Sequence, residues 1–221
     1  MITVTEQKPF EQIVESLARC KNVYIIGCGT CPTMLHTGGK TEVLEMKEKL
    51  EAQGKSVVGW MVIPTACDDL TKDALRESKK EIDKADCLLI MSCAFGVQTV
   101  GSNTDKRVFP ALNTLFLGKE DPLGSISEMC IQCGSCVLDK TAGVCPVASC
   151  AKSLFNGPCG GSVNGKCEVS KDTPCAWQLI IDRLSALGQL DELDEIQPVK
   201  DWSTSNSGGP RSITVAEKEN S

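Results

Sequence analysis

The chain has 221 residues, 23 basic and 29 acidic side chains, a net charge of −6 at neutral pH and 14 cysteines. Its apolar runs fall short of the roughly 20 residues of a membrane-spanning helix, and a net negative charge with few aromatic residues argues against a nucleic-acid surface. The amino terminus has no apolar segment typical of a secretory signal, so we expect a cytoplasmic protein. In that reducing compartment, cysteines bind metals more often than they form disulfides.

From residue 8 to about 118, short apolar runs alternate with longer amphipathic stretches, which predicts an α/β domain. In chain order, the predicted elements are a strand over 22–28, a helix over about 41–52, a strand over 56–62, a helix over about 70–84, a strand over 86–91 and a strand around 115–117. Near-continuous apolar strands joined by helices are typical of a parallel sheet covered on both faces. The predicted organisation is a small parallel-sheet α/β domain over 1–120, a cysteine-rich cluster-binding domain with a C-terminal helix over 121–190, and a flexible tail over 191–221.

Four cysteines follow the predicted strands at the points where those strands end: Cys28, Cys31, Cys67 and Cys93. Parallel strands all finish at one edge of the sheet, where open α/β sheets bind their ligands. Four thiolates at one edge suit a [4Fe–4S] cluster or an all-thiolate zinc site. The alternative is that these are four small buried apolar side chains, which is a common use of free cysteine.

Two other cysteines of this region fit a structural use better. Cys20 closes the first helical stretch and Cys87 lies inside a strand, so we interpret both as core residues. His36, the single histidine, is interpreted as a solvated loop residue, although it could also touch a cluster.

The remaining eight cysteines crowd into residues 130–175. Cys130, Cys133 and Cys136 form a C-x2-C-x2-C pattern that is characteristic of iron–sulfur ligation. Bacterial ferredoxins place the next cysteine three residues later, whereas Cys145 follows after eight, so the spacing leaves open which cluster it joins. The others are set among glycines: Cys150, Cys159, Cys167 and Cys175.

Eight cysteines are enough for two cubane clusters, and the alternative is one cluster with a zinc knuckle or non-ligating thiols. The segment has few apolar residues, so we expect a metal to hold it together. Thr173 is a candidate N-cap and Pro174 a candidate first residue of a helix that begins near Cys175. Its apolar stripe favours packing in a core over a partner groove and consists of Trp177, Ile180, Ile181, Leu184 and Leu187.

The chain resembles a known family at several of these segments: CIQCGSC, GVCPVASCAKSLFNGPCGG and CAWQLIIDRLSALG, with GCGTCPT, MSCAFGVQTV and PALNTLFLG upstream. Over roughly residues 10–190 it closely resembles the methylenetetrahydrofolate reductase C-terminal-domain family, whose acetogen-type members are iron–sulfur small subunits. The resemblance implies a heteromeric complex with a flavin-containing catalytic subunit. In that complex the chain would relay electrons between a donor, such as an upstream electron-donor protein, and the partner's FMN or FAD. The reaction would interconvert methylenetetrahydrofolate and methyltetrahydrofolate, as in the Wood–Ljungdahl pathway.

The residues themselves offer no other cofactor site. There is no dinucleotide-binding or P-loop pattern and no recognisable folate or flavin site, so we predict no catalytic residue in this chain. With Cys20 and Cys87 set aside, the cysteines permit two or three [4Fe–4S] clusters, with zinc possible at one site. Two other functions stay open: a zinc-stabilised scaffold for the same flavoprotein, and a thiol redox enzyme that uses Cys28 and Cys31.

Overall fold

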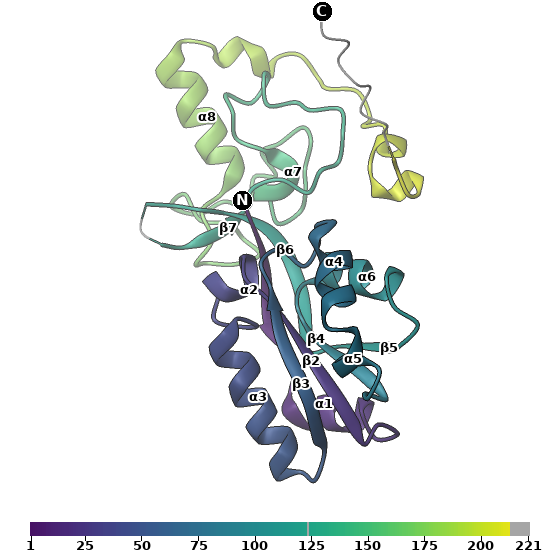
Figure 1. Ribbon diagram of the computed structural model, residues 1–221. Coiled ribbons are helices and arrows are strands. Elements are labelled where there is room, and N and C mark those ends of the chain that lie inside the picture. The colour runs from purple at the N-terminus through teal and green to yellow at the C-terminus, as the bar shows by residue number, and fades with distance from the viewer. Residues whose placement is uncertain (123, 213–221) are drawn as a thin grey trace, which may run out of the picture. The chain divides into compact units, whose positions relative to one another are not determined.

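The computed structural model describes residues 1–122 and 124–212, and the chain divides into two compact units, the second beginning at Ser127 (Figure 1). The prediction of an α/β fold with cysteines after the parallel strands, a cysteine-rich segment and a C-terminal helix is confirmed. Among the described residues, no helix has the length and apolar character needed to cross a bilayer. Of the predicted flexible tail over 191–221, residues 213–221 lie outside the described part.

The first unit is built on a four-stranded parallel sheet in the order β3-β2-β4-β5. The strands are β2 (Asn22–Cys28), β3 (Ser56–Ile63), β4 (Cys87–Met91) and β5 (Arg107–Pro110). Every residue of β4 is buried, and so are the last six of β2, because helices cover both faces of this part of the sheet. That burial explains their continuous apolar sequences.

Helices pack on both faces of the parallel sheet (Figure 1). One face carries α1 (Phe10–Ser16) and α3 (Lys40–Ala52), and the other α4 (Leu70–Glu77), α5 (Lys79–Ile82) and α6 (Ala94–Ser102). Along β4, Leu89 belongs to the first core and Leu88 and Ile90 to the second, as the alternation of side chains in a strand requires. A short helix, α2 (Cys31–Met34), follows β2.

The sequence prediction placed the fourth parallel strand wrongly. Residues 115–117 lie in β6 (Leu112–Glu120), which pairs antiparallel with β1 (Ile2–Gln7) in a separate sheet of order β1-β6-β7, completed by β7 (Ile126–Glu128). The fourth parallel strand is instead β5, which has only four residues and buries one of them. Because β5 is so short, it has no long apolar run by which it could be identified. The sequence of β6 mixes polar and apolar residues, as is typical of a half-exposed antiparallel strand.

The structure also corrects the helix predicted over 70–84, which is divided into two helices, α4 and α5. Ser78 ends α4 and precedes α5, with φ −90° and ψ 10°, and its hydroxyl donates to Met61 Sδ at 3.8 Å. Serine side chains that form hydrogen bonds outside a helix compete with the helical hydrogen-bond pattern, which favours an end of the helix at Ser78.

The second unit contains little regular structure around one small core. Its helices are α7 (Pro146–Ser149) and α8 (Ala176–Leu187), followed by three 3-10 turns, η1 (Leu190–Leu193), η2 (Trp202–Thr204) and η3 (Asn206–Gly208). The core consists of Cys175, Trp177, Ile180 and Leu184, with partly buried neighbours. Three residues of the predicted apolar stripe of α8 therefore pack in this core, whereas Ile181 is half-buried and Leu187 is 59% exposed. Cys175, rather than Thr173, is the N-cap of α8.

Candidate metal centres

The parallel sheet gathers four cysteines at one edge, which we name the strand-end set. Cys28 is the last residue of β2, Cys31 the first of α2, Cys67 follows β3, and Cys93 is the N-cap of α6. Cys28 and Cys93 are buried, Cys31 is half-buried and Cys67 is exposed. All the cysteines of the chain are free thiols, so none of them is committed to a disulfide.

Electrostatics shows that the strand-end thiols lie close together. Burial raises the pKa of the Cys67 thiol, and electrostatic interactions with Cys93, Cys28 and Cys31 raise it further. Like charges disfavour one another only over short distances in a protein, so the other three members lie within reach of Cys67. A bound cation would remove this repulsion and take the place of the thiol protons.

The surroundings of Cys28 and Cys93 suit thiolate ligands of a cluster. The backbone N–H of Ala66 donates to Cys28 Sγ at 3.5 Å, and Thr30 Oγ1 lies 3.3 Å from the same sulfur. Next to Cys93, the buried Ser92 hydroxyl has no hydrogen-bond partner among the described residues. A side chain at Gly96 would collide with Ser92 and Ala66, so this glycine lets α6 approach the edge. The orphaned hydroxyl and the amide donors fit a thiolate-bound cluster, whose sulfurs accept such hydrogen bonds.

In the second unit, four cysteines line a single hollow of about 250 Å³. We name them the CxxCxxC set: Cys130, Cys133, Cys136 and Cys145. The sequence left the partner of Cys145 open, and the fold brings it to the triple cysteine pattern. The rest of the lining is mainly apolar and includes Met129, Ile131, Leu138 and Val147, together with Lys200.

Backbone N–H groups also donate hydrogen bonds to two sulfurs of the CxxCxxC set. The N–H of Gln132 donates to Cys130 Sγ at 3.4 Å, and that of Ala148 donates to Cys145 Sγ, also at 3.4 Å. Gln132 has φ +52°, a left-handed conformation that folds the loop back over Cys130. Hydrogen bonds of this kind stabilise thiolates and orient them toward a metal.

The other four cysteines of the second unit line a much smaller hollow of about 20 Å³. This glycine-rich set consists of Cys150, Cys159, Cys167 and Cys175. Burial disfavours the thiolate of Cys175, but N–H of Gln178, the Ser162 hydroxyl and N–H of Trp177 donate to its sulfur and bring its pKa below the usual value. A lowered pKa favours the thiolate, which is the form of cysteine that binds metals.

To bind a metal, the side chains of each set would have to rotate toward a common centre. In the described residues, no three side chains of Cys, His, Asp or Glu already stand in the geometry of a bound metal ion. Each set nevertheless offers four soft sulfur donors, the complement of a [4Fe–4S] cluster or a tetrahedral zinc ion.

Cys20 and Cys87 lie away from these sets, in the core between α1, α3 and the sheet. Burial, and then the hydrogen bond and charge of Cys20, raise the pKa of the Cys87 thiol, so it stays protonated. The interpretation of both as core residues is confirmed. His36 is an exposed loop residue, as expected, with its Nδ1 3.8 Å from Glu42 Oε1.

We therefore expect Cys87→Ser to weaken the core without removing metal. A buried hydroxyl in place of a thiol costs about 1–3 kcal/mol when its hydrogen bonds are incomplete. Amide hydrogen exchange of β4 peptides measures this loss as a lower free energy of opening. Iron content should equal that of the unsubstituted protein, and a loss as large as that of Cys93→Ser would make Cys87 a ligand.

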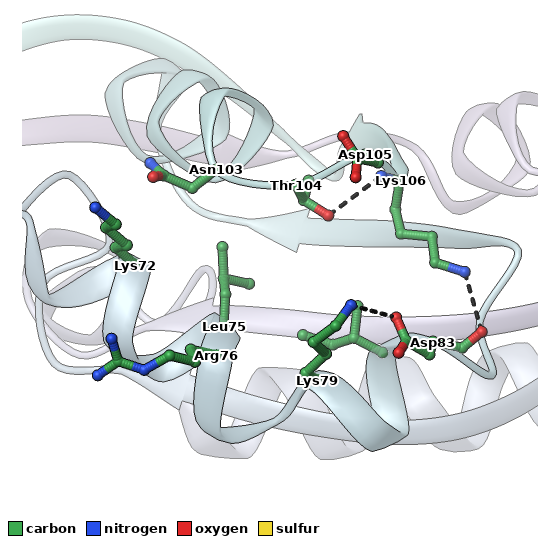
Figure 2. A pocket seen from close by; sticks show the side chains of 10 residues that line it. Lys72, Leu75, Arg76, Lys79, Asp83, Asn103, Thr104, Asp105 and Lys106 are labelled. Atoms are coloured by element: carbon green, nitrogen blue, oxygen red, sulfur yellow. Dashed lines mark hydrogen bonds and ion pairs between the residues drawn. The ribbon is translucent and has the colours of Figure 1, made fainter.

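A further hollow, of about 310 Å³, lies beside α4 and α5 and was not predicted from the sequence (Figure 2). Its lining includes four basic and two acidic side chains. Lys79 Nζ lies 3.1 Å from Asp83 Oδ1, and Lys106 Nζ donates to the carbonyl oxygens of Asp83 and Ala85. Its lining includes no cysteine or histidine, so it offers no thiolate or imidazole ligand for a metal.

A family model described as "methylene-tetrahydrofolate reductase C terminal" matches residues 109–203. The comparison with curated proteins finds no match, and neither does the comparison with solved structures. The matched region contains the CxxCxxC set, the glycine-rich set and α8, whereas the strand-end set lies before it. Over residues 109–203, the chain is thus similar to the C-terminal domain of methylenetetrahydrofolate reductases.

Proposed function

We propose that this protein is the iron–sulfur electron-transfer subunit of a methylenetetrahydrofolate reductase complex. It relays electrons between a donor protein and the FMN or FAD of a catalytic partner subunit, for the interconversion of methylenetetrahydrofolate and methyltetrahydrofolate. The observation that carries the proposal is that two hollows within the matched region are each lined by four cysteines. A reducing cytoplasm suits such thiolate ligands.

The hollow of the CxxCxxC set favours a cluster over a single ion. Four thiolates hold a zinc ion at about 2.3 Å, which leaves little space between them. A hollow of about 250 Å³ with a mainly apolar lining has room for a cubane of four irons and four sulfides. The glycine-rich set encloses only about 20 Å³ and therefore also suits zinc.

The two sites of the second unit are neighbours along the chain. Cys145 and Cys150 are the N-cap and C-cap of α7, which has four residues. At a rise of 1.5 Å per residue, the five steps from Cys145 to Cys150 span only about 8 Å along the axis. Adjacent redox centres are what a relay needs, since electrons pass between centres only when these are close.

The chain's own residues would bind the clusters, shield them and present them to a partner. When bound, a [4Fe–4S] cluster accepts and releases single electrons. The amides of Ala66, Gln132 and Ala148 hold thiolate sulfurs in place. The side chains of Met129, Ile131 and Leu138 border the CxxCxxC hollow and are 54%, 41% and 39% exposed, so this site lies near the surface, where a redox partner can approach.

A zinc scaffold is the alternative for the same partner, and metal analysis separates the two. A thiol redox enzyme would need an unligated thiol with a lowered pKa at the strand-end set. That enzyme would use Cys28 and Cys31, so iron bound at the strand-end set would exclude it.

We expect this chain alone to be inactive on folate substrates and the pair with a flavin-containing methylenetetrahydrofolate reductase subunit to turn over. The assay mixes the anaerobically purified subunits with methyltetrahydrofolate and an artificial electron acceptor, and follows cluster absorbance. Cys133→Ser and Cys159→Ser should slow turnover, while Cys87→Ser serves as the control.

Three results would contradict the proposal. One is a colourless protein that contains zinc only, prepared under strict anaerobiosis. The second is a flavoprotein that exchanges electrons with each donor as fast without this chain as with it. The third is unchanged turnover in the cluster-ligand variants, which would make the chain a scaffold.

A further inference from the structure

Lys200 is a buried cation in the wall of the CxxCxxC hollow. Its side chain lines the same hollow as the four cysteines, and the residue is only 9% exposed. Its Nζ donates to the carbonyl oxygens of Gly134 at 2.9 Å and Ser135 at 2.7 Å, both between Cys133 and Cys136. The ammonium group also lies 5.6 Å from the centre of the Trp202 ring and 6.0 Å from that of Phe155.

The segment around Lys200 holds the cysteine loop at four consecutive carbonyl groups. Besides the two bonds from Lys200, Thr204 Oγ1 donates to the carbonyl of Cys133 at 3.2 Å, and Arg211 Nη2 donates to that of Gln132 at 3.3 Å. Gly134 has φ +65°, and a Cβ there would lie 2.6 Å from Thr204 Oγ1, so the two segments pack closely. The ammonium group is thereby fixed relative to the loop that carries Cys133 and Cys136.

The charge of Lys200 is only partly compensated by the groups around it. Within the described residues, its partners are carbonyl oxygens and aromatic rings, and no carboxylate forms an ion pair with its Nζ. Hydrogen bonds from Ser203, and to a smaller extent the charge of Lys200, lower the pKa of Asp201. The Asp201 carboxylate accepts its hydrogen bond from N–H of Ser203 at 2.8 Å and forms no ion pair with Lys200 among the described residues. A buried cation is costly unless an anionic group lies nearby, and four thiolates with a cluster would supply one.

We propose that Lys200 is a positioning residue whose fixed positive charge raises the reduction potential of the cluster held by Cys130, Cys133, Cys136 and Cys145. One-electron reduction adds a negative charge to the cluster while its ligands stay in place. A fixed cation beside it stabilises the reduced form more than the oxidised form, and the low dielectric of a buried site strengthens the effect. This inference rests on the proposed function, because it requires a cluster at this site.

The test compares neutral and charged replacements of Lys200 in the full-length protein. K200M removes the charge and the hydrogen bonds, K200Q removes the charge but keeps N–H donors, and K200R keeps the charge. K171M removes the same charge from an exposed position as a matched control. Each variant is purified anaerobically, its iron and sulfide are measured, and the cluster is titrated potentiometrically with EPR detection. The signal of this site is the one that Cys133→Ser lacks.

We expect about a tenfold higher ratio of oxidised to reduced cluster at a given potential in K200M and K200Q, which is a midpoint about 59 mV lower for one electron. K200R and K171M should stay within about twofold of the unsubstituted protein. The inference is overturned if the neutral variants keep their iron and shift no more than K171M. Loss of the cluster from both neutral variants also overturns it, because Lys200 would then be structural. Unsubstituted protein without iron and sulfide would instead refute the proposed function.

Discussion

Removal of the metal should unfold the second unit while the first unit stays folded. The first unit has two cores, one on each face of its parallel sheet, built from helices and strands. Among its described residues, the second unit has one hydrophobic core cluster, made of four buried side chains and their partly buried neighbours, and its long connections run between cysteines. Binding of a structural metal contributes about 10–16 kcal/mol in zinc peptides, as much as the whole stability of an ordinary domain. With the proposed clusters bound, residues 127–212 should therefore depend on them for folding.

Hydrogen exchange with mass spectrometry measures this difference within one molecule. After anaerobic chelation, peptides of residues 130–187 should exchange at the rate of an unfolded chain, while peptides of β2 and β4 keep their protection. Reconstitution with iron and sulfide should restore protection of α8. Protection of residues 146–187 that survives complete removal of iron and zinc would show that the apolar core of α8 suffices, and would contradict the prediction.

Single serine substitutions should remove the clusters one at a time. If each set of four thiolates holds one [4Fe–4S] cluster, loss of one cluster removes about one third of the iron and sulfide. Cys93→Ser should lose the strand-end cluster, Cys145→Ser the CxxCxxC cluster and Cys167→Ser the cluster of the glycine-rich set. Iron, sulfide and zinc per chain are measured on protein purified anaerobically. A zinc ion at the glycine-rich set would make Cys167→Ser lose zinc instead of iron.

The controls test which cysteines share a cluster as well as how many clusters the chain binds. Cys87→Ser changes a buried cysteine of β4 close in sequence to Cys93, and it should keep all its metal. Cys133→Ser should abolish the same EPR signal as Cys145→Ser, because the two residues line one hollow. If Cys145→Ser abolished the signal that Cys159→Ser abolishes, the assignment of Cys145 would be wrong.

Local patterns in the sequence were sufficient for the central strands and for α3 and α8. The strand predicted over 22–28 coincides with β2, because its residues are buried on both faces and its apolar run is continuous. In α8 the apolar residues recur at the helical period, so the sequence alone indicated which side of the helix is buried. The cysteine-rich segment was likewise identified by the spacing of its cysteines.

Short or half-exposed elements could not be predicted in this way. The edge strand β5 buries only one residue, and β1 pairs with β6 across more than half of the first unit's sequence. Neither has a local pattern strong enough to decide between a strand of the parallel sheet and one of another sheet. The break at Ser78 depends on a contact with Met61, 17 residues earlier in the chain.

The sequence by itself determined that this protein has an α/β unit, a cysteine-rich segment and thiols placed after parallel strands. These features depend on residue type, apolar period and spacing, which act over a few residues of chain. Tertiary structure alone decided that Cys145 lies with the triple cysteine pattern, that Cys150 lies with three later cysteines, and that Lys200 enters the hollow of the CxxCxxC set. Lys200 and the carbonyls it binds are 66 and 65 residues apart, so their contact depends on how distant segments pack and not on any local preference of the chain.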